Sequence, residues 1–154
     1  MPRSAIDPTP VRRMICDPSF AGLSLNHAGD KTMQSLAEIA NDYITMMAAG
    51  EILAAAEKYW ASDIVALEPN QTEKSDPVIA IGKPAALARL ANWLEANAIS
   101  ELLIDGPFIT GDQFALFIDM EITRHATGIR QPFSEIATYT VREGQIVEER
   151  FFYG

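Results

Sequence analysis

Apolar residues recur at helical spacing in the first part of the chain. Four of them lie three and four positions apart and define one face of a helix that begins near Thr32: Leu36, Ile39, Tyr43 and Met47. Ser35 and Glu38 have the spacing of a capping box inside this segment. Gly50 interrupts the pattern, as glycine commonly does at a helix C-terminus. The spacing therefore predicts a helix that ends before residue 50.

Two more helices and a short strand are predicted further along. A short helix follows at residues 51–60, and a strand at residues 63–68 ends at Pro69. Residues 70–77 are polar and typical of a turn. A third helix opens at residues 82–84, where a proline in the first turn loses no hydrogen bond. Its buried face would consist of apolar residues at helical spacing, namely Leu87, Leu90, Ala91 and Leu94.

From residue 99 onward the pattern changes to that of strands. Four strands are predicted, at residues 101–109, 113–125, 131–142 and 145–153. Three turn sequences separate them: Gly111-Asp112, Thr127-Gly128 and Glu143-Gly144. Helices first and an antiparallel meander last predict an α+β domain.

Several strands carry apolar residues on both faces. In the last strand, alternation puts Val147, Phe151 and Tyr153 on one face, and Ile146 and Phe152 on the other. A sheet with two apolar faces needs a cover on each side. Because the helices can cover only one face, we expect a second subunit on the other, and hence a homodimer.

Charge and cysteine content narrow the choice of partners and location. The chain has 154 residues and a formal net charge of −9. The acidic excess lies in residues 31–154, which disfavours binding to nucleic acid and to anionic membranes. Cys16 is the only cysteine, and no stretch resembles a signal peptide or a membrane span. We expect a cytoplasmic protein, in which the proline-rich residues 1–30 form an arm that is partly disordered or draped over the domain.

Three segments carry a resemblance to a known family: residues 43–51, 60–69 and 139–149. In order and spacing they are similar to the nuclear transport factor 2-like superfamily, especially its SnoaL-like polyketide cyclase and ketosteroid isomerase branches. The resemblance covers about residues 33–154. It implies a cystatin-like cone at residues 31–154, in which about three N-terminal helices pack on a curved, mostly antiparallel sheet around a pocket for a hydrophobic small molecule.

The resemblance also assigns positions to three catalytic candidates. Tyr43 falls where the isomerase branch has an oxyanion-hole tyrosine, and Glu68 falls where it has a catalytic carboxylate, with Glu in place of Asp. The second oxyanion acid of that branch would fall at Ala137, which is a departure. Glu135 lies two residues earlier, on the same sheet face, and can supply a carboxylic acid there.

The expected ligand-binding residues are apolar, with one acid among them. They are Met47, Trp60, Trp93, Met120, Ile122, Phe133, Ala137, Glu149, Phe151 and Tyr153. Aromatic clusters are more often plain core than pocket wall. In this fold, however, the core and the pocket wall are continuous.

Each catalytic candidate has a structural alternative. Glu68 is either a desolvated carboxylate that moves protons or a solvated acid at a strand end. Tyr43 either stabilises an oxyanion or is a core tyrosine. Glu135 is either a protonated hydrogen-bond donor or a carboxylate that pairs with an arginine such as Arg124 or Arg150.

A metal site is not expected. Asp119 and Glu121 alternate with apolar residues and should face the outer side of the sheet. His27 and His125 show no ligand spacing relative to these acids. We expect neither a metal nor an organic cofactor.

Two classes of function follow. The first is a cofactor-free isomerase, cyclase or dehydratase that acts on a hydrophobic carbonyl compound. The alternative is a non-catalytic module that binds a small ligand or assembles as a dimer. Hydrolysis by an activated water is a third class, which normally needs an Asp–Arg–Asp-like relay that the sequence does not reveal.

Overall fold

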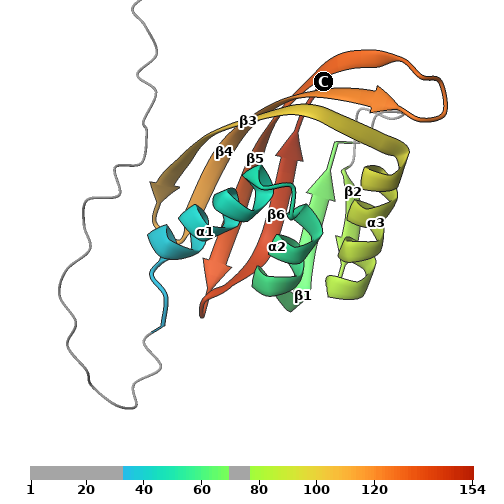
Figure 1. The fold of residues 1–154 in the computed structure, drawn as a ribbon. Coiled ribbons are helices and arrows are strands. Elements are labelled where there is room, and N and C mark those ends of the chain that lie inside the picture. The colour runs from blue at the N-terminus through green and yellow to red at the C-terminus, as the bar shows by residue number, and fades with distance from the viewer. Residues whose placement is uncertain (1–32, 70–76) are drawn as a thin grey trace, which may run out of the picture. The chain divides into compact units, whose positions relative to one another are not determined.

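The computed structural model describes residues 33–69 and 77–154. The predicted arm at residues 1–30, and all but the last residue of the predicted turn at 70–77, lie outside these ranges. The elements are α1 (Leu36–Ala48), α2 (Ile52–Tyr59), β1 (Trp60–Glu68), β2 (Val78–Ile81), α3 (Lys83–Ala96), β3 (Asn97–Thr110), β4 (Gln113–Arg124), β5 (Arg130–Arg142) and β6 (Gln145–Phe152) (Figure 1). No helix in the described ranges is long and apolar enough to cross a membrane.

The capping box is confirmed, but it lies at the start of the first helix. The Ser35 hydroxyl accepts a hydrogen bond from the Glu38 amide at 3.3 Å. The Glu38 carboxylate accepts one from the Ser35 amide at 2.7 Å. Ser35 has extended backbone angles, so α1 begins at Leu36 rather than near Thr32.

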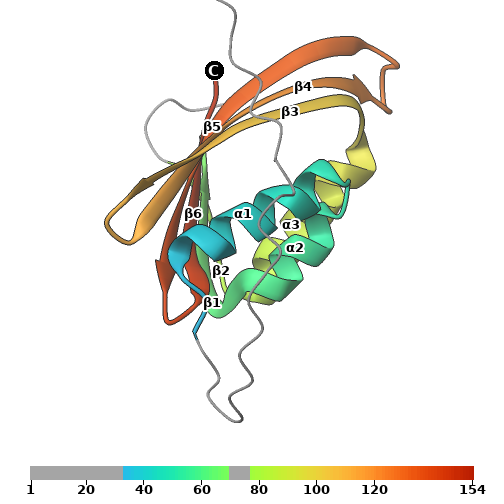
Figure 2. The same ribbon diagram turned by 60° about the vertical axis from the view of Figure 1, so that its left-hand side comes forward.

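Six strands form one sheet in the order β2-β1-β6-β5-β4-β3. Only β1 and β6 are parallel neighbours, and the other pairs are antiparallel. The short edge strand β2 was not predicted, and β1 begins at Trp60 instead of residue 63. The four remaining strands and their turns are confirmed within a few residues. The three helices all cover the same face of the sheet (Figure 2).

Irregular pairing bends the sheet around the helices. The register between β3 and β4 shifts twice, once between Ile99 and Glu101 and once between Asp105 and Phe108. Gly106 lies in the second shift with a φ of +135°, and a Cβ there would come within 2.9 Å of the Ala115 carbonyl oxygen. Bulges of this kind bend a strand and increase its twist, which gives the sheet its concave inner face.

The acids of β4 lie on the outer face, as predicted. Ile118, Met120 and Ile122 are buried on the inner face. Between them, Asp119 accepts a hydrogen bond from the Ser134 hydroxyl at 2.6 Å. Glu121 forms an ion pair with Arg130 of β5. The alternation of β4 thus separates an apolar inner face from a charged outer one.

The alternation predicted for β6 is wrong at its start. A register shift separates the Thr140–Glu148 pair from the Val141–Ile146 pair, so one extra residue is accommodated in β6. As a result, Ile146 belongs to the hydrophobic core, on the same face as Glu149, although simple counting had put it with Phe152. This bulge also determines which β6 side chains point inward.

An apolar row crosses the outer face. Phe117, Ile136 and Phe152 are direct neighbours on β4, β5 and β6, and each is 41–48% exposed. Leu103 on β3 adds a further exposed side chain. We propose that a second copy of the chain covers this row and forms a homodimer with two-fold symmetry. Ile136 lies at the centre of the row, where a symmetric contact would bury it most deeply.

We predict that Ile136→Glu converts a dimer to a monomer, because it would bury an uncompensated carboxylate in the interface. Light scattering at micromolar concentration measures the effect. Ile129→Glu is the matched control, since Ile129 is similarly exposed but lies in the turn after β4. A monomeric wild-type protein, or an Ile136→Glu variant that is still a dimer, would contradict the proposal.

Candidate functional site

A cavity lies between the helices and the concave face of the sheet. All three catalytic candidates line it, together with eight of the ten predicted binding residues: Met47, Trp60, Trp93, Met120, Phe133, Glu149, Phe151 and Tyr153. Its free space is about 70 Å³, several times the roughly 10–15 Å³ that one water needs on the same scale. The inner face of the sheet is therefore not fully packed.

Two predicted binding residues do not line the cavity. Ala137 is completely buried and belongs to the hydrophobic core, between Leu116 of β4 and Phe151 of β6 in the sheet register. Ile122 is also buried, but it lies towards the far end of β4, where it pairs with Gln131. Both side chains point inward as predicted. They pack against core residues because the cavity occupies only part of the inner face.

Tyr43 is a buried residue in the wall of the cavity. Its ring packs against Phe114 and Tyr139, with centroids 6.3 and 5.2 Å away. The Trp60 indole donates a hydrogen bond to its hydroxyl oxygen at 3.2 Å. Burial, and to a lesser extent the charge of Glu149, raises the pKa of Tyr43. The hydroxyl therefore keeps its proton and can still donate it in a hydrogen bond.

Glu68 lies at the end of β1 in a partly exposed part of the site. The Arg89 Nε contacts its Oε1 at 3.1 Å, and the Tyr153 hydroxyl donates to its Oε2 at 3.3 Å. The Glu68 side chain is 27% exposed. The carboxylate therefore contacts both a cation and a hydrogen-bond donor. Glu68 is thus neither a bare desolvated acid nor a fully solvated one.

Two further carboxyl groups lie deeper in the cavity. Burial raises the pKa of Glu149 to about 8, although the positive charge of Arg89 opposes this increase. Burial and the charge of Glu68 raise the pKa of Glu135 to about 7. At neutral pH, Glu149 is therefore mostly protonated and Glu135 is protonated in about half of the molecules. The suggested partners of Glu135, Arg124 and Arg150, are exposed and do not line the cavity.

The sequence did not reveal the role of Arg89. Its side chain lines the cavity from α3 and is only 21% exposed. The helical spacing contained a signal, because position 89 lies three residues after Ala86 and four before Trp93, both of which line the cavity. An arginine within such a buried stripe requires a partner for its charge. Tyr139 is another polar residue of the cavity that was absent from the predicted set; the remaining unpredicted lining residues are apolar.

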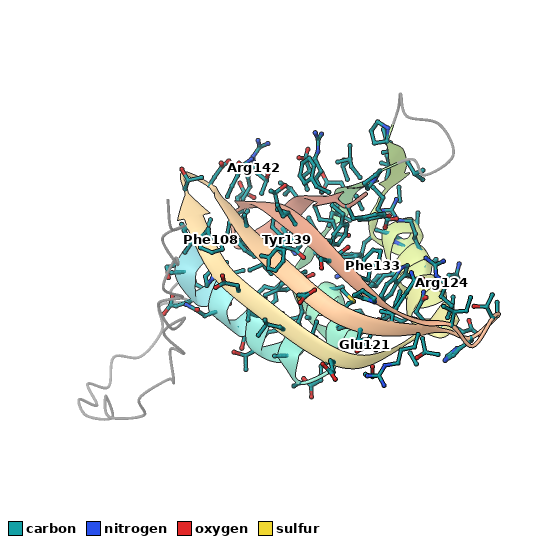
Figure 3. The ribbon with its side chains drawn as sticks, turned by 90° about the horizontal axis from the view of Figure 1, so that it is seen from above. Phe108, Glu121, Arg124, Phe133, Tyr139 and Arg142 are labelled. Atoms are coloured by element: carbon teal, nitrogen blue, oxygen red, sulfur yellow. The ribbon has the colours of Figure 1, made fainter. Side chains whose placement is uncertain are left out.

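Aromatic rings form one wall of the site. Phe133 of β5 packs between Trp93 and Tyr153, with ring centroids 6.0 and 5.1 Å apart. Figure 3 shows Phe133 and Tyr139 on the curved sheet, seen from above. Flat apolar walls of this kind suit a planar ring as ligand.

A metal site is not formed by the described side chains. Within residues 33–69 and 77–154, no group of three or more His, Cys, Asp or Glu side chains has a suitable arrangement. Cys16 and His27 lie outside these ranges. The polar groups that line the cavity are carboxyl, guanidinium, phenol and indole groups.

The cone of helices on a curved sheet, with an internal cavity, defines a nuclear transport factor 2-like fold. Residues 34–153 match the family model described as the SnoaL-like domain. The chain therefore belongs to the SnoaL-like family. No functionally curated protein matches the sequence.

Solved structures agree with this assignment. A proposed SnoaL-like polyketide cyclase from Mesorhizobium loti is 37% identical, with a TM-score of 0.71, over 78% of this chain and 100% of that chain. A second proposed SnoaL-like polyketide cyclase, from Jannaschia sp. CCS1, is 12% identical with a TM-score of 0.60, over 74% and 84% of the two chains. A ketosteroid isomerase-like protein from Catenulispora acidiphila is 11% identical with a TM-score of 0.60, over 76% and 85%. The last two similarities show the fold alone.

We predict that stability falls as pH rises. Glu135 and Glu149 have raised pKa values in the folded state, so their stabilising contribution is complete below about pH 4.5 and is lost as pH rises through about 7 and 8. One pKa unit corresponds to about 1.4 kcal/mol. With folded-state pKa values of about 7 and 8 against 4.5 for a free glutamate, we expect the free energy of unfolding to fall by about 5 kcal/mol between about pH 5.5 and about pH 8.5, measured by urea denaturation.

Glu149→Gln should roughly halve this pH dependence, because the amide cannot ionise. Glu148→Gln is the matched control, since Glu148 is adjacent in sequence but lines a cleft on the outer face. A pH dependence that is the same in the wild type and Glu149→Gln would show that Glu149 is not desolvated.

Proposed function

We propose that the chain is a cofactor-free enzyme that moves a proton at a carbon next to a carbonyl group, in an isomerisation, cyclisation or dehydration. One observation carries the proposal. A carboxylate that binds a cation, Glu68, shares an apolar cavity with two carboxyl groups whose pKa values burial raises, Glu135 and Glu149. Pairs of acids whose environments separate their protonation states are typical of acid–base catalysis.

Glu68 is the proposed base. Its carboxylate would take the proton from the carbon next to the carbonyl. It would then return that proton to another position of the same substrate. The contact with the Tyr153 hydroxyl orients the carboxylate, and its partial exposure leaves it accessible to a ligand.

Glu135 is the proposed donor to the enolate oxygen. In its protonated form it can donate a hydrogen bond to the negative charge that develops there. It takes the place of the acid that would stand at Ala137 in the isomerase branch. Tyr43 adds a donor in the cavity wall, because its hydroxyl accepts from Trp60 and keeps its own hydrogen.

The comparisons support the class of reaction rather than a substrate. The Mesorhizobium loti neighbour is named as a proposed polyketide cyclase, and a neighbour from Pseudomonas putida carries a similar name. Ring formation in such compounds proceeds through enolates, and this matches a site that can take and give protons.

A water-activating hydrolase is the second candidate. The sequence showed no acid–arginine–acid relay, but the cavity contains one possible set. The set is Glu68, Arg89 and Glu149. Arg89 binds Glu68, and the positive charge of Arg89 opposes the increase in the Glu149 pKa. Opening of styrene oxide by the wild type, and not by Glu149→Gln, would favour this candidate over proton transfer at carbon.

We predict that the wild type catalyses exchange of deuterium from D₂O into the α-positions of small aromatic ketones such as 2-tetralone, measured by proton NMR. Glu68→Gln should lower the rate by about 10²- to 10⁴-fold, the usual contribution of general acid–base catalysis. Glu148→Gln should have no effect, because that side chain lies on the outer face. Undiminished exchange in Glu68→Gln would remove Glu68 from the mechanism.

The pH profile gives an independent prediction. Exchange by the wild type should decrease above about pH 7, because Glu135 then loses the proton that it donates. Glu135→Gln should abolish this decrease, since an amide remains a donor at high pH. Ligand binding in thermal-shift assays without exchange for any ketone would instead favour the non-catalytic binding module.

A further inference from the structure

The guanidinium of Arg89 is only partly satisfied by the protein. Its Nε contacts Oε1 of Glu68 at 3.1 Å, and its Nη1 donates to the Val78 carbonyl at 3.4 Å. Its Nη2 is buried and has no hydrogen-bond partner among the described residues. Leaving a buried charged donor unpaired is costly, so nearly all such groups have a partner in the functional state.

The position of this nitrogen indicates where the missing acceptor lies. Nε and Nη2 lie on the same edge of a guanidinium, the edge that usually binds both oxygens of a carboxylate. Here Glu68 occupies only the Nε half of that edge. Arg89 and Glu68 both line the cavity, so a ligand oxygen that reaches Nη2 from the cavity lies next to the carboxylate.

The charge balance indicates what kind of oxygen it is. Glu68 already neutralises Arg89, which is the only cation among the described residues that line the cavity. Glu135 and Glu149 would both become harder to ionise beside another anion. A ligand with a permanent negative charge is therefore disfavoured, and a neutral carbonyl oxygen fits the free donor.

We propose that Arg89 is a catalytic residue that binds the base through Nε and the substrate's carbonyl oxygen through Nη2. This inference rests on the proposed proton transfer at carbon. It adds a residue that the resemblance did not assign, and it gives the free nitrogen a role.

The arrangement explains how charge moves during the reaction. As the C–H bond breaks, its proton forms an O–H bond with Glu68, and its electron pair becomes the new C=C bond. The π electrons of the carbonyl group move onto its oxygen, which becomes the enolate. Negative charge thus leaves the Glu68 carboxylate at Nε and appears on the enolate oxygen at Nη2, while the total charge of the site stays constant. A fixed cation beside both positions stabilises the product of the transfer without reorganisation.

Arginine suits this role better than lysine. Its planar fork presents two parallel N–H groups in a fixed geometry, whereas an ammonium group is a single point charge. The Val78 carbonyl, which accepts from Nη1, fixes the plane of the fork from the third side.

The test uses 4-nitrophenol as a probe of the enolate, because its phenolate form absorbs at a different wavelength from the phenol. The pKa of the bound probe is measured by absorbance titration with excess wild-type protein. In Arg89→Gln we expect this pKa to be higher by at least about one unit, a tenfold change in ionisation, because a cation within about 4–6 Å shifts a pKa by roughly 1–3 units. Arg89→Lys should give an intermediate value. Arg150→Gln, on the exposed outer side of β6, should match the wild type.

A double variant separates direct contact from a charge effect through Glu68. Glu68→Gln with Arg89→Gln removes the ion pair without changing the net charge. If Nη2 binds the probe oxygen, the pKa of the bound probe stays above the wild-type value. If Arg89 only neutralises Glu68, that pKa returns to the wild-type value, and the proposal is overturned. Circular dichroism verifies that each variant is folded before titration.

The result is independent of whether the protein proves to be an enzyme. Absence of deuterium exchange together with a raised probe pKa in both Arg89→Gln variants would reject the proposed reaction but retain Arg89 as the oxygen-binding residue. Deuterium exchange with equal probe pKa values in the wild type and Arg89→Gln would retain the reaction and reject the role of Arg89. Failure of 4-nitrophenol to bind the wild type at millimolar concentration also counts against the inference.

Discussion

Desolvation of carboxyl groups is the constraint on which this site depends. Three glutamates line one largely apolar cavity, and Arg89 is the only cation among the described residues around it. One negative charge can be compensated there, and it resides on Glu68. The other two acids avoid the charge by holding their protons more tightly. The raised pKa values of Glu135 and Glu149 thus follow first from burial, and the negative charge of Glu68 raises both further.

The fold creates these environments through the irregularities of its sheet. The bulge in β6 turns Ile146 inward, onto the same face as Glu149, so that the acid is buried beside core residues. The parallel pairing of β1 with β6 puts Glu68 near the same end of the sheet as Tyr153, which binds it. The helix α3 then crosses this region and supplies Arg89. Strands β1 and β6 and helix α3 thus bring these groups together in one cavity.

The sequence predicted those parts of the structure that depend on local periodicity. Helical spacing identified α1 and α3, and alternation along β4 separated Ile118 from Asp119 correctly. Prediction from spacing failed where the pairing between strands decides which face a side chain is on. The bulge that turns Ile146 inward depends on the register with β5, which no spacing within β6 reveals. The four-residue edge strand β2 is too short to produce a periodic signal.

The candidate site shows the same division. Tyr43, Glu68 and Glu135 were predicted from position, and all three line the cavity. Ala137 and Ile122 face inward but lie outside the cavity. Alternation along a strand predicts which face of the sheet a side chain is on, but not how far the cavity extends over that face. In sequence Arg89 gave only a weak signal, its helical spacing from Ala86 and Trp93. In the fold it is a largely buried cation with one nitrogen that has no partner among the described residues. Such a group is retained at the expense of stability, since an apolar residue would pack there without an unpaired donor. Its presence in an apolar cavity is therefore more readily explained by binding a ligand than by supporting the fold.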